Sequence, residues 1–257
     1  MFKYILWDLD NTLLDPHPPE RASIRNCFKD FNLGECTDAM LDTYPAINHK
    51  WWTMCERGEK PKSEILVGRF ADFLGQFGLR TDIAPEFAKD YMERLGDTIC
   101  PIDGAMETLT SLRGRFGQYL VTNGVWASQK KKIQNSGIDK IIDGIFVSED
   151  IGFEKPEEQI YQIVLNRIGC TDRSEALMVG DSLTTDIKGA NNAGIACCWF
   201  NRKGQERPLD LRIDYEIHRI PELLDIVSNA RYLWYHLSYE EDSFDWYWWN
   251  HCFQPHR

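Results

Sequence analysis

YILWDLDNTL, at residues 4–13, sets four apolar residues directly before a pair of aspartates. The apolar run Tyr4–Trp7 predicts a short buried strand that ends where Asp8 and Asp10 begin. In open parallel sheets, ligands bind at the carboxyl ends of the strands, so we expect chemistry at these two residues. Two carboxylates there can bind a hard cation, or one can act as a nucleophile while the other transfers protons. A solvated acidic turn is the alternative for this pair alone.

Further short apolar runs follow residue 102, and patterns typical of helices lie between them. Alternation of near-continuous apolar strands with helices predicts an α/β fold, in which helices cover both faces of a parallel sheet. The expected strands are Tyr119–Val121, Ile145–Val147, Ala176–Val179 and Ala196–Phe200, and the expected helices are Gly104–Phe116, Ser128–Ser136, Glu157–Ile168, Thr184–Ala193 and Pro221–Ser228.

The remaining residues divide the chain into further regions. Residues 15–97 are mainly helical in pattern, with no convincing strand, and predict a helical cap inserted between two core segments, 1–14 and 98–229. Residues 230–257 are rich in tryptophan and tyrosine and follow neither helical nor strand periodicity. This tail has no assigned role: it is a disordered extension, a gene-boundary artefact, or a docking segment, since aromatic clusters favour interfaces.

Composition narrows the classes of partner. The formal net charge of -11 argues against a nucleic acid polymer, whose phosphate backbone needs basic patches. No apolar stretch approaches the length of a membrane span, and the N-terminus resembles no targeting signal. Eight cysteines at irregular spacing predict core thiols in a reducing cytoplasm. A small phosphorylated substrate remains compatible with the charge, because a few local cations, backbone amides and a metal ion can bind it.

Two segments between strands and helices offer groups for a phosphate. Thr122, Asn123 and the following glycine end the second expected strand, where a hydroxyl and backbone amides can bind phosphate oxygens. Lys155 directly precedes Pro156, at which a helix is expected to begin, and a helix N-terminus with an ammonium group favours anions. The alternatives are an ordinary turn at the first segment and a solvated surface lysine at the second.

Another acidic segment, GDSLTTD at residues 180–186, follows the expected strand Ala176–Val179. Asp181 lies at the strand end, where it can bind a metal ion. Asp186 comes one helical turn later and can hold a metal-bound water or a backbone amide. Helix capping by Asp181 or Ser182 is the alternative.

In order along the chain, these segments resemble the motifs of the haloacid dehalogenase-like (HAD) hydrolase superfamily. DLDNT at residues 8–12 resembles its first motif, Thr122 its second, Lys155 its third, and the pair Asp181 and Asp186 its fourth. Within the superfamily, DLDNTLLD, TNG and GDSL are similar to the pyrimidine 5′-nucleotidases of the YjjG/YfnB type. The resemblance implies a modified Rossmann-like core with a helical cap after the first motif.

The resemblance also implies a mechanism. Asp8 would be the nucleophile that forms an aspartyl phosphate, and Asp10 would protonate the leaving group and then activate water. Thr122 and Lys155 would hold the phosphoryl group, while Asp8, the Asp10 carbonyl and Asp181 would bind Mg²⁺. The substrate implied is a small phosphate monoester, foremost a pyrimidine nucleoside 5′-monophosphate.

Other functions stay open at this point. A phosphatase or phosphomutase acting on a sugar phosphate or phosphoglycolate carries the same acidic pair, whereas the dehalogenases of the superfamily lack its second member. A phosphate-binding or receiver-like module is the non-enzyme alternative, although it does not need so large an insert. In the cap, Tyr44, His49, Trp51 and Trp52 could stack on a base or simply pack the interior of the cap.

Overall fold

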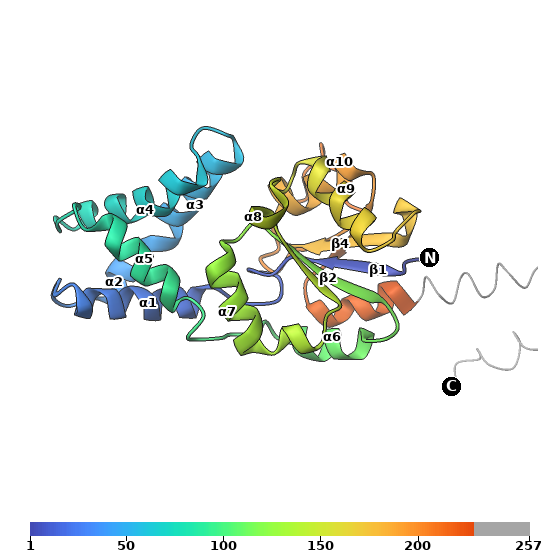
Figure 1. Cartoon of the computed structure of the whole chain (residues 1–257), viewed down its shortest axis with the longest axis horizontal. Coiled ribbons are helices and arrows are strands. Elements are labelled where there is room, and N and C mark those ends of the chain that lie inside the picture. The colour runs from blue at the N-terminus through green and yellow to red at the C-terminus, as the bar shows by residue number, and fades with distance from the viewer. Residues whose placement is uncertain (229–257) are drawn as a thin grey trace, which may run out of the picture.

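The six strands form one parallel sheet in the order β3-β2-β1-β4-β5-β6, as the computed structural model of residues 1–228 shows (Figure 1). The tail 230–257 lies outside the described residues. β1 pairs with both β2 and β4, so the first strand is central and the chain reverses direction across the sheet beside it. The strands are β1 Tyr4–Trp7, β2 Gly117–Thr122, β3 Gly144–Val147, β4 Ala176–Gly180, β5 Ala196–Phe200 and β6 Tyr215–Ile217.

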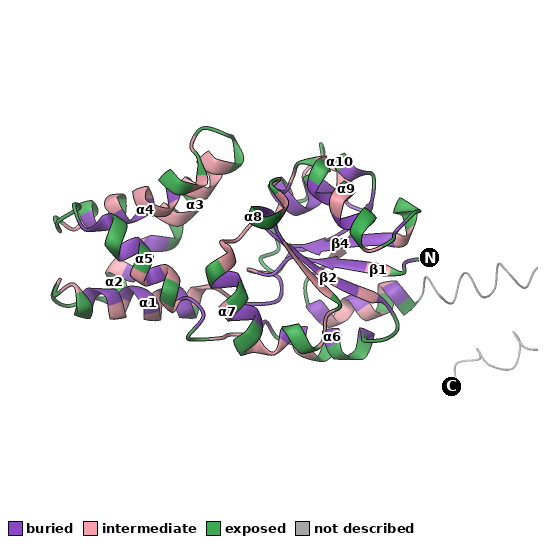
Figure 2. Cartoon of the chain, viewed as in Figure 1, coloured by how far each residue is buried: buried purple, intermediate pink, exposed green. Residues whose placement is uncertain are grey.

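Helices cover both faces of this sheet, as predicted. Ile5 and Trp7 point to one hydrophobic cluster and Leu6 to another, because successive strand side chains face opposite sides. Figure 2 colours most of the strands, and parts of the helices around them, as buried. The helices around the sheet are α6 Ala105–Leu112, α7 Trp126–Ser136, α8 Ser148–Ile151, α9 Glu158–Arg167 and α10 Lys188–Ala193, with a further helix at 223–228. The α/β prediction is therefore confirmed.

Several boundaries differ from the expected ones. α6 stops at Leu112, because Arg113 leaves the helical conformation with a ψ of 131°, and Gly114 follows with a left-handed φ of 71°. The expected helix Thr184–Ala193 is divided into a π-helical turn, Leu183–Ile187, and α10. The short strand β6 was not predicted, because it has three residues and only one of them is buried. Single-turn 3₁₀ helices occupy Ile138–Lys140, Arg173–Glu175 and Ile220–Glu222.

Five helices between β1 and α6 lie together beside the sheet, on the left of Figure 1. They enclose a hydrophobic cluster of their own, in which the rings of Phe70 and Tyr91 lie 4.7 Å apart. Where the chain enters and leaves this group, the Asp15 amide donates to the Cys100 carbonyl at 2.8 Å, so the two connections run side by side. The helices are α1 His17–Asp30, α2 Asp38–Leu41, α3 Tyr44–Glu56, α4 Lys62–Gln76 and α5 Ala84–Arg94.

The described part of the chain adds two observations on its chemistry. Its seven cysteines are free thiols, four of them buried. None of its helices is both long enough and apolar enough to cross a membrane.

Candidate active site

The aspartates after β1 lie in a compact turn. The Asp8 amide still donates to the Val179 carbonyl, as in the sheet, but Leu13 and Leu14 both donate back to the Leu9 carbonyl. Asn11 closes the turn at a φ of 65°, a conformation that asparagine tolerates better than most residues. Consequently Asp8 and Asp10 leave the strand in different directions.

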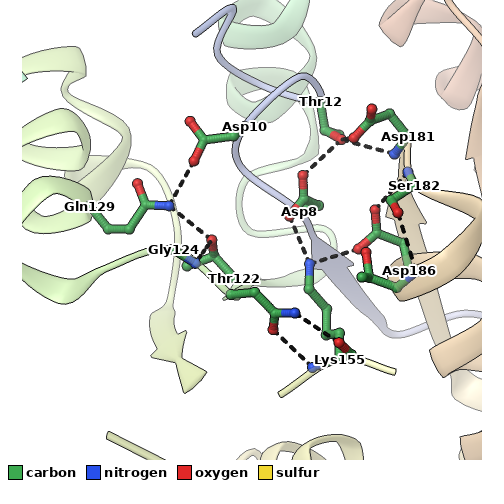
Figure 3. Close-up of polar contacts among 12 residues, drawn as sticks. Asp8, Asp10, Thr12, Thr122, Gly124, Gln129, Lys155, Asp181, Ser182 and Asp186 are labelled. Atoms are coloured by element: carbon green, nitrogen blue, oxygen red, sulfur yellow. Dashed lines mark hydrogen bonds and ion pairs between the residues drawn. The ribbon is translucent and has the colours of Figure 1, made fainter. Parts of the chain in front are cut away.

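Asp8 forms the centre of a buried charged cluster (Figure 3). Lys155 Nζ donates to Asp8 Oδ1 and to Asp186 Oδ1, at 2.7 Å in each case. Burial raises the pKa of Asp8 to about 7 in spite of Lys155, and the negative charge of Asp186 acts in the same direction. Burial lowers the pKa of Lys155, but Asp186 and Asp8 outweigh it, so that pKa is raised and the ammonium stays charged.

The loop after β4 holds the other two aspartates beside Asp8. Asp186 Oδ2 accepts a hydrogen bond from the Ser182 amide at 3.0 Å, which anchors its carboxylate under the loop. A Cβ at Gly180 would lie 2.2 Å from the same oxygen, so glycine is required there. The Asp181 amide donates to Thr12 Oγ1 at 3.1 Å, and this hydroxyl in turn donates to Asp8 Oδ2 at 3.1 Å.

The carboxylates of Asp8, Asp181 and Asp186 offer oxygen atoms that all lie within 4.8 Å of one another. Burial, followed by the charges of Asp8 and Asp186, raises the pKa of Asp181. The cluster therefore holds three acidic groups against the single ammonium of Lys155. An oxygen-only set with excess negative charge suits a hard divalent cation, which would relieve the repulsion.

The carboxylate of Asp10 lies outside this cluster and contacts α7 instead. Lys132 Nζ donates to Asp10 Oδ1 and Gln129 Nε2 to Asp10 Oδ2, at 2.8 Å in each case. Gln129 Nε2 also donates to Thr122 Oγ1 at 3.0 Å. Asp10 is thus held by a buried amide and a buried ammonium, next to the hydroxyl at the end of β2.

Asn123 and Lys155 differ from the expected arrangement. Asn123 Nδ2 donates to the Lys155 carbonyl, and the Lys155 amide donates to Asn123 Oδ1, at 2.8 Å in each case. The Asn123 side chain therefore orients the lysine. Lys155 precedes Pro156 as stated, but α9 begins only at Glu158. Lys155 therefore offers its own charge to the site, and not the end of a helix.

A cleft of about 530 Å³ opens over these groups. Its floor includes Asp8, Asp10, Thr122, Asn123, Lys155, Asp181 and Asp186, and its opposite wall comes from α1, α3, α4 and α5. His49 and Trp52 line the cleft, whereas Tyr44 and Trp51 do not. Tyr44 instead stacks on Phe70 in the interior of the helical group. Of the two alternatives, packing in the interior of the cap therefore holds for Tyr44, and stacking on a base stays open for His49 and Trp52.

The geometry of this site agrees with the family and the relatives that the chain matches in sequence. Residues 2–194 match the family model of the haloacid dehalogenase-like hydrolases. The chain belongs to this family. It is 34% identical to the HAD-hydrolase YfnB of Bacillus subtilis over 227 residues, which cover 88% of this chain and 96% of YfnB. A magnesium-bound crystal structure of YfnB matches with a TM-score of 0.83 over 88% of this chain and 98% of that one.

Two further relatives carry names that state a substrate. The pyrimidine 5′-nucleotidase PynA of Streptococcus pneumoniae is 32% identical over 231 residues, which cover 88% of this chain and 95% of PynA. The glyceraldehyde 3-phosphate phosphatase of Methanopyrus kandleri is 36% identical over 237 residues, which cover 88% of this chain and 97% of that protein. The resemblance to HAD hydrolases, including the nucleotidase branch, is therefore confirmed.

Gln129 and Lys132 belong to none of the HAD motifs, so the sequence did not predict them as site residues. They occupy buried positions on the same face of α7 as Ile133. The available signal was weak: Gln129 and Lys132 lie three residues apart and share a helix face with Ile133, but Ile133 is the one apolar residue among the buried residues of α7. A polar pair on a helix face is usually solvated, and only the contacts with Thr122 and Asp10, from distant segments of the chain, show that this pair is buried.

Proposed function

We propose that this HAD hydrolase is a magnesium-dependent phosphatase that acts on a pyrimidine nucleoside 5′-monophosphate through an aspartyl phosphate at Asp8. The observation that carries the proposal is the position of Asp8. Its carboxylate lies at the end of the central strand, touches Lys155, and faces a cleft whose other wall is the helical cap. A nucleophile, a fixed positive charge and space for a substrate thus occur together. A receiver-like module needs no such covered cleft.

The chemistry follows from the placement of the two acids. A carboxylate oxygen of Asp8 attacks phosphorus, the bond from phosphorus to the ester oxygen breaks, and protonated Asp10 donates its proton to the departing alkoxide. Asp10, now ionised, accepts a proton from water as this water attacks the aspartyl phosphate. Inorganic phosphate leaves, and Asp8 is regenerated as a carboxylate.

The other predicted residues have supporting roles in this proposal. Lys155 and Thr122 bind the phosphoryl oxygens, because phosphoryl transfer depends mainly on positioning and neutralisation of charge. Asn123 acts on the phosphate indirectly, through the backbone of Lys155. Asp186 holds Lys155 from the other side and fixes the Asp181 loop through Ser182.

Magnesium would be held by Asp8, Asp181 and the Asp10 carbonyl, with Asp186 supporting the set. When bound, it neutralises charge on the transferring phosphoryl group. Chelation should therefore abolish turnover, and Asp181→Asn should raise the magnesium concentration for half-maximal activity at least about 10-fold. The activity titration is to be paired with thermal unfolding, in which added magnesium raises the midpoint of the wild type much more than that of Asp181→Asn.

Asp103→Asn is the matched control for the metal site, because Asp103 is exposed and absent from the residues that line the cleft. It should keep the magnesium response of the wild type. Full activity of the wild type after exhaustive chelation, or an unchanged magnesium response in Asp181→Asn, would contradict the metal site.

The nucleotide part of the proposal is tested by a panel of phosphate monoesters under magnesium saturation. The cleft extends from Asp8 to the aromatic ring of Trp52 in the cap, which gives a base room and a stacking surface. The similarity to PynA supports a nucleotide, whereas the similarity to the Methanopyrus kandleri enzyme supports a sugar-type phosphate as the second candidate. If a sugar phosphate or phosphoglycolate has a kcat/KM tenfold above every nucleotide, the nucleotidase proposal is wrong.

The same panel of esters distinguishes a phosphomutase from a phosphatase by the products that form. A mutase transfers the phosphoryl group to a second hydroxyl of a sugar phosphate, so it yields an isomer and little inorganic phosphate. Release of one phosphate per ester consumed is the result we expect.

Lys132 should support the acid and base function of Asp10, to which it donates at 2.8 Å. Lys132→Met is expected to lower kcat about 10- to 100-fold, the range for loss of a hydrogen bond between charged groups. Because the effect passes through Asp10, it should be larger for an alkyl phosphate than for an aryl phosphate, whose leaving group needs less protonation. Lys132→Arg should restore part of the activity.

Lys130→Met is the control for Lys132, since Lys130 lies on the exposed side of the same helix. Steady-state kinetics with both esters and a thermal melt of each variant make the comparison. An equal loss with both esters, without rescue by arginine, would show that Lys132 only stabilises the fold.

A further inference from the structure

Gln129 in α7 is a buried amide of which only one half has hydrogen-bond partners. Its side-chain Nε2 donates to Asp10 Oδ2 at 2.8 Å and to Thr122 Oγ1 at 3.0 Å, so both amide hydrogens are used (Figure 3). Oε1 is buried as well, and no donor to it is found among residues 1–228. An unpaired buried carbonyl is unfavourable, and an apolar side chain of the same length would avoid it. Packing alone therefore does not account for Gln129.

The orientation of this amide determines what the Thr122 hydroxyl can do. A hydroxyl has one hydrogen to donate and two positions at which it accepts. Thr122 Oγ1 accepts from Gln129 Nε2 and, at 3.2 Å, from the Gly124 amide, so both accepting positions are filled. Within the described part of the chain, no acceptor of the hydroxyl hydrogen is found. Thr122 lines the cleft over Asp8, so this hydrogen is left for a ligand in the cleft.

Gly124 gives the Gln129 amide the space that it occupies. A Cβ at Gly124 would lie 1.7 Å from Gln129 Nε2 and 2.4 Å from Gln129 Cδ. The φ of Gly124 is not in the left-handed region, so the backbone conformation by itself does not require glycine there. The close approach of Gln129 is therefore the reason for a residue without a side chain at this position.

We propose that Gln129 is a positioning residue for phosphoryl transfer, which turns the single hydrogen of the Thr122 hydroxyl toward an oxygen of the phosphoryl group. The same amide contacts Asp10, so the group that binds the phosphoryl oxygens and the group that transfers protons share one support. Phosphoryl transfer depends mainly on the positions of such groups. The inference rests on the proposed phosphatase function, and it concerns the part that all phosphate monoesters share.

The first test is the inhibition constant of inorganic phosphate, measured with p-nitrophenyl phosphate as the substrate at saturating magnesium. Gln129→Met keeps the length of the side chain and removes both donors. It should raise this constant about 10-fold, the size of one hydrogen bond to a charged group, because the Thr122 hydroxyl can then turn away. In a Thr122→Val background, the same substitution should change the constant less than about 2-fold, since no hydroxyl is left to orient.

The second test isolates the contact between Gln129 and Asp10. Gln129→Met should lower kcat more for an alkyl phosphate than for p-nitrophenyl phosphate, whose leaving group needs less protonation. This difference should persist in the Thr122→Val background, because it does not pass through the hydroxyl. A side chain that only filled space would affect both esters and both backgrounds alike.

Gly124→Ala is an independent variant, because it keeps Gln129 and the Gly124 amide but places a methyl group where Gln129 Nε2 lies. It should raise the inhibition constant of phosphate as Gln129→Met does. Combined with Gln129→Ala, which removes the contact, it should have no further effect. Thermal melts identify any variant that unfolds, and if Gln129→Met does so, Gly124→Ala decides.

Gln134→Met is the matched control, because Gln134 is exposed on the same helix and absent from the residues that line the cleft. It should keep the wild-type kcat and inhibition constant.

Two failures are distinguishable. If the wild type hydrolyses phosphate monoesters but folded Gln129→Met keeps its inhibition constant, or shows the same increase with and without the Thr122 hydroxyl, the inference is wrong and the proposed function stands. If the wild type hydrolyses no phosphate monoester, the proposed function fails and the inference fails with it.

Discussion

Asp8→Asn is expected to lower kcat at least about 10⁴-fold for every phosphate monoester, as removal of a covalent nucleophile does in other enzymes. An amide cannot attack phosphorus, whereas the size and shape of the side chain hardly change. The fold should survive, because Asp8 is a carboxylate whose pKa burial already raises to about 7 and which costs free energy to keep charged. Circular dichroism and thermal melting of the purified variant test that part.

Formation of the aspartyl phosphate can be measured directly. After an acid quench during turnover of a labelled ester, the wild type should carry phosphate that hydroxylamine removes, and Asp8→Asn should carry none. Asp103→Asn, at an exposed aspartate, controls for the substitution itself. Wild-type activity in a folded Asp8→Asn protein would eliminate the covalent mechanism.

Asp10→Asn should reduce kcat about 10²- to 10⁴-fold with an alkyl phosphate, the usual contribution of a general acid or base. The geometry permits a sharper expectation with p-nitrophenyl phosphate. Its leaving group departs without a proton, so the first step should remain fast, while attack of water on the aspartyl phosphate loses its base. We therefore expect a burst of about one equivalent of nitrophenol per active site, followed by slow turnover.

Stopped-flow absorbance measures this burst, and the same quench experiment should show phosphorylated protein accumulating in Asp10→Asn. Equal losses with both esters and no burst would show that Asp10 does not serve both steps. Lys132 and Gln129 each donate to one carboxylate oxygen of Asp10, and asparagine keeps only one acceptor oxygen, so a thermal melt of Asp10→Asn accompanies the kinetics.

Much of the core could be predicted from local sequence. Buried parallel strands need continuous apolar runs, and each run here ends in polar residues, so strand and site were visible together in residues 4–13. The element boundaries were less predictable. β6 is too short and too polar to stand out, and the π-helical turn at Leu183–Ile187 depends on the Ser182 side chain and on Asp186 beneath the loop.

Most of the site residues that could be predicted lie at strand ends, and Lys155 and Asp186 were predicted from the segments that lead into helices. Asp8, Thr122 and Asp181 lie at strand ends, and the structure brings them to one edge of the sheet. Asn123 had the same position, yet its side chain turns toward the backbone of Lys155. A sequence states which polar side chains are present at a strand end. It does not state which of them will form hydrogen bonds to another segment of the chain.

The sequence by itself determined five of the strands, the family and the order of the candidate site residues, because each of these depends on residues adjacent along the chain. Tertiary structure alone decided that Lys132 contacts Asp10 and that Gln129 joins Asp10 to Thr122. Polar residues on a helix resemble solvated ones until another element covers them. Whether such a charge is exposed or buried, and so whether it is inert or functional, depends on packing between segments that lie far apart in the chain.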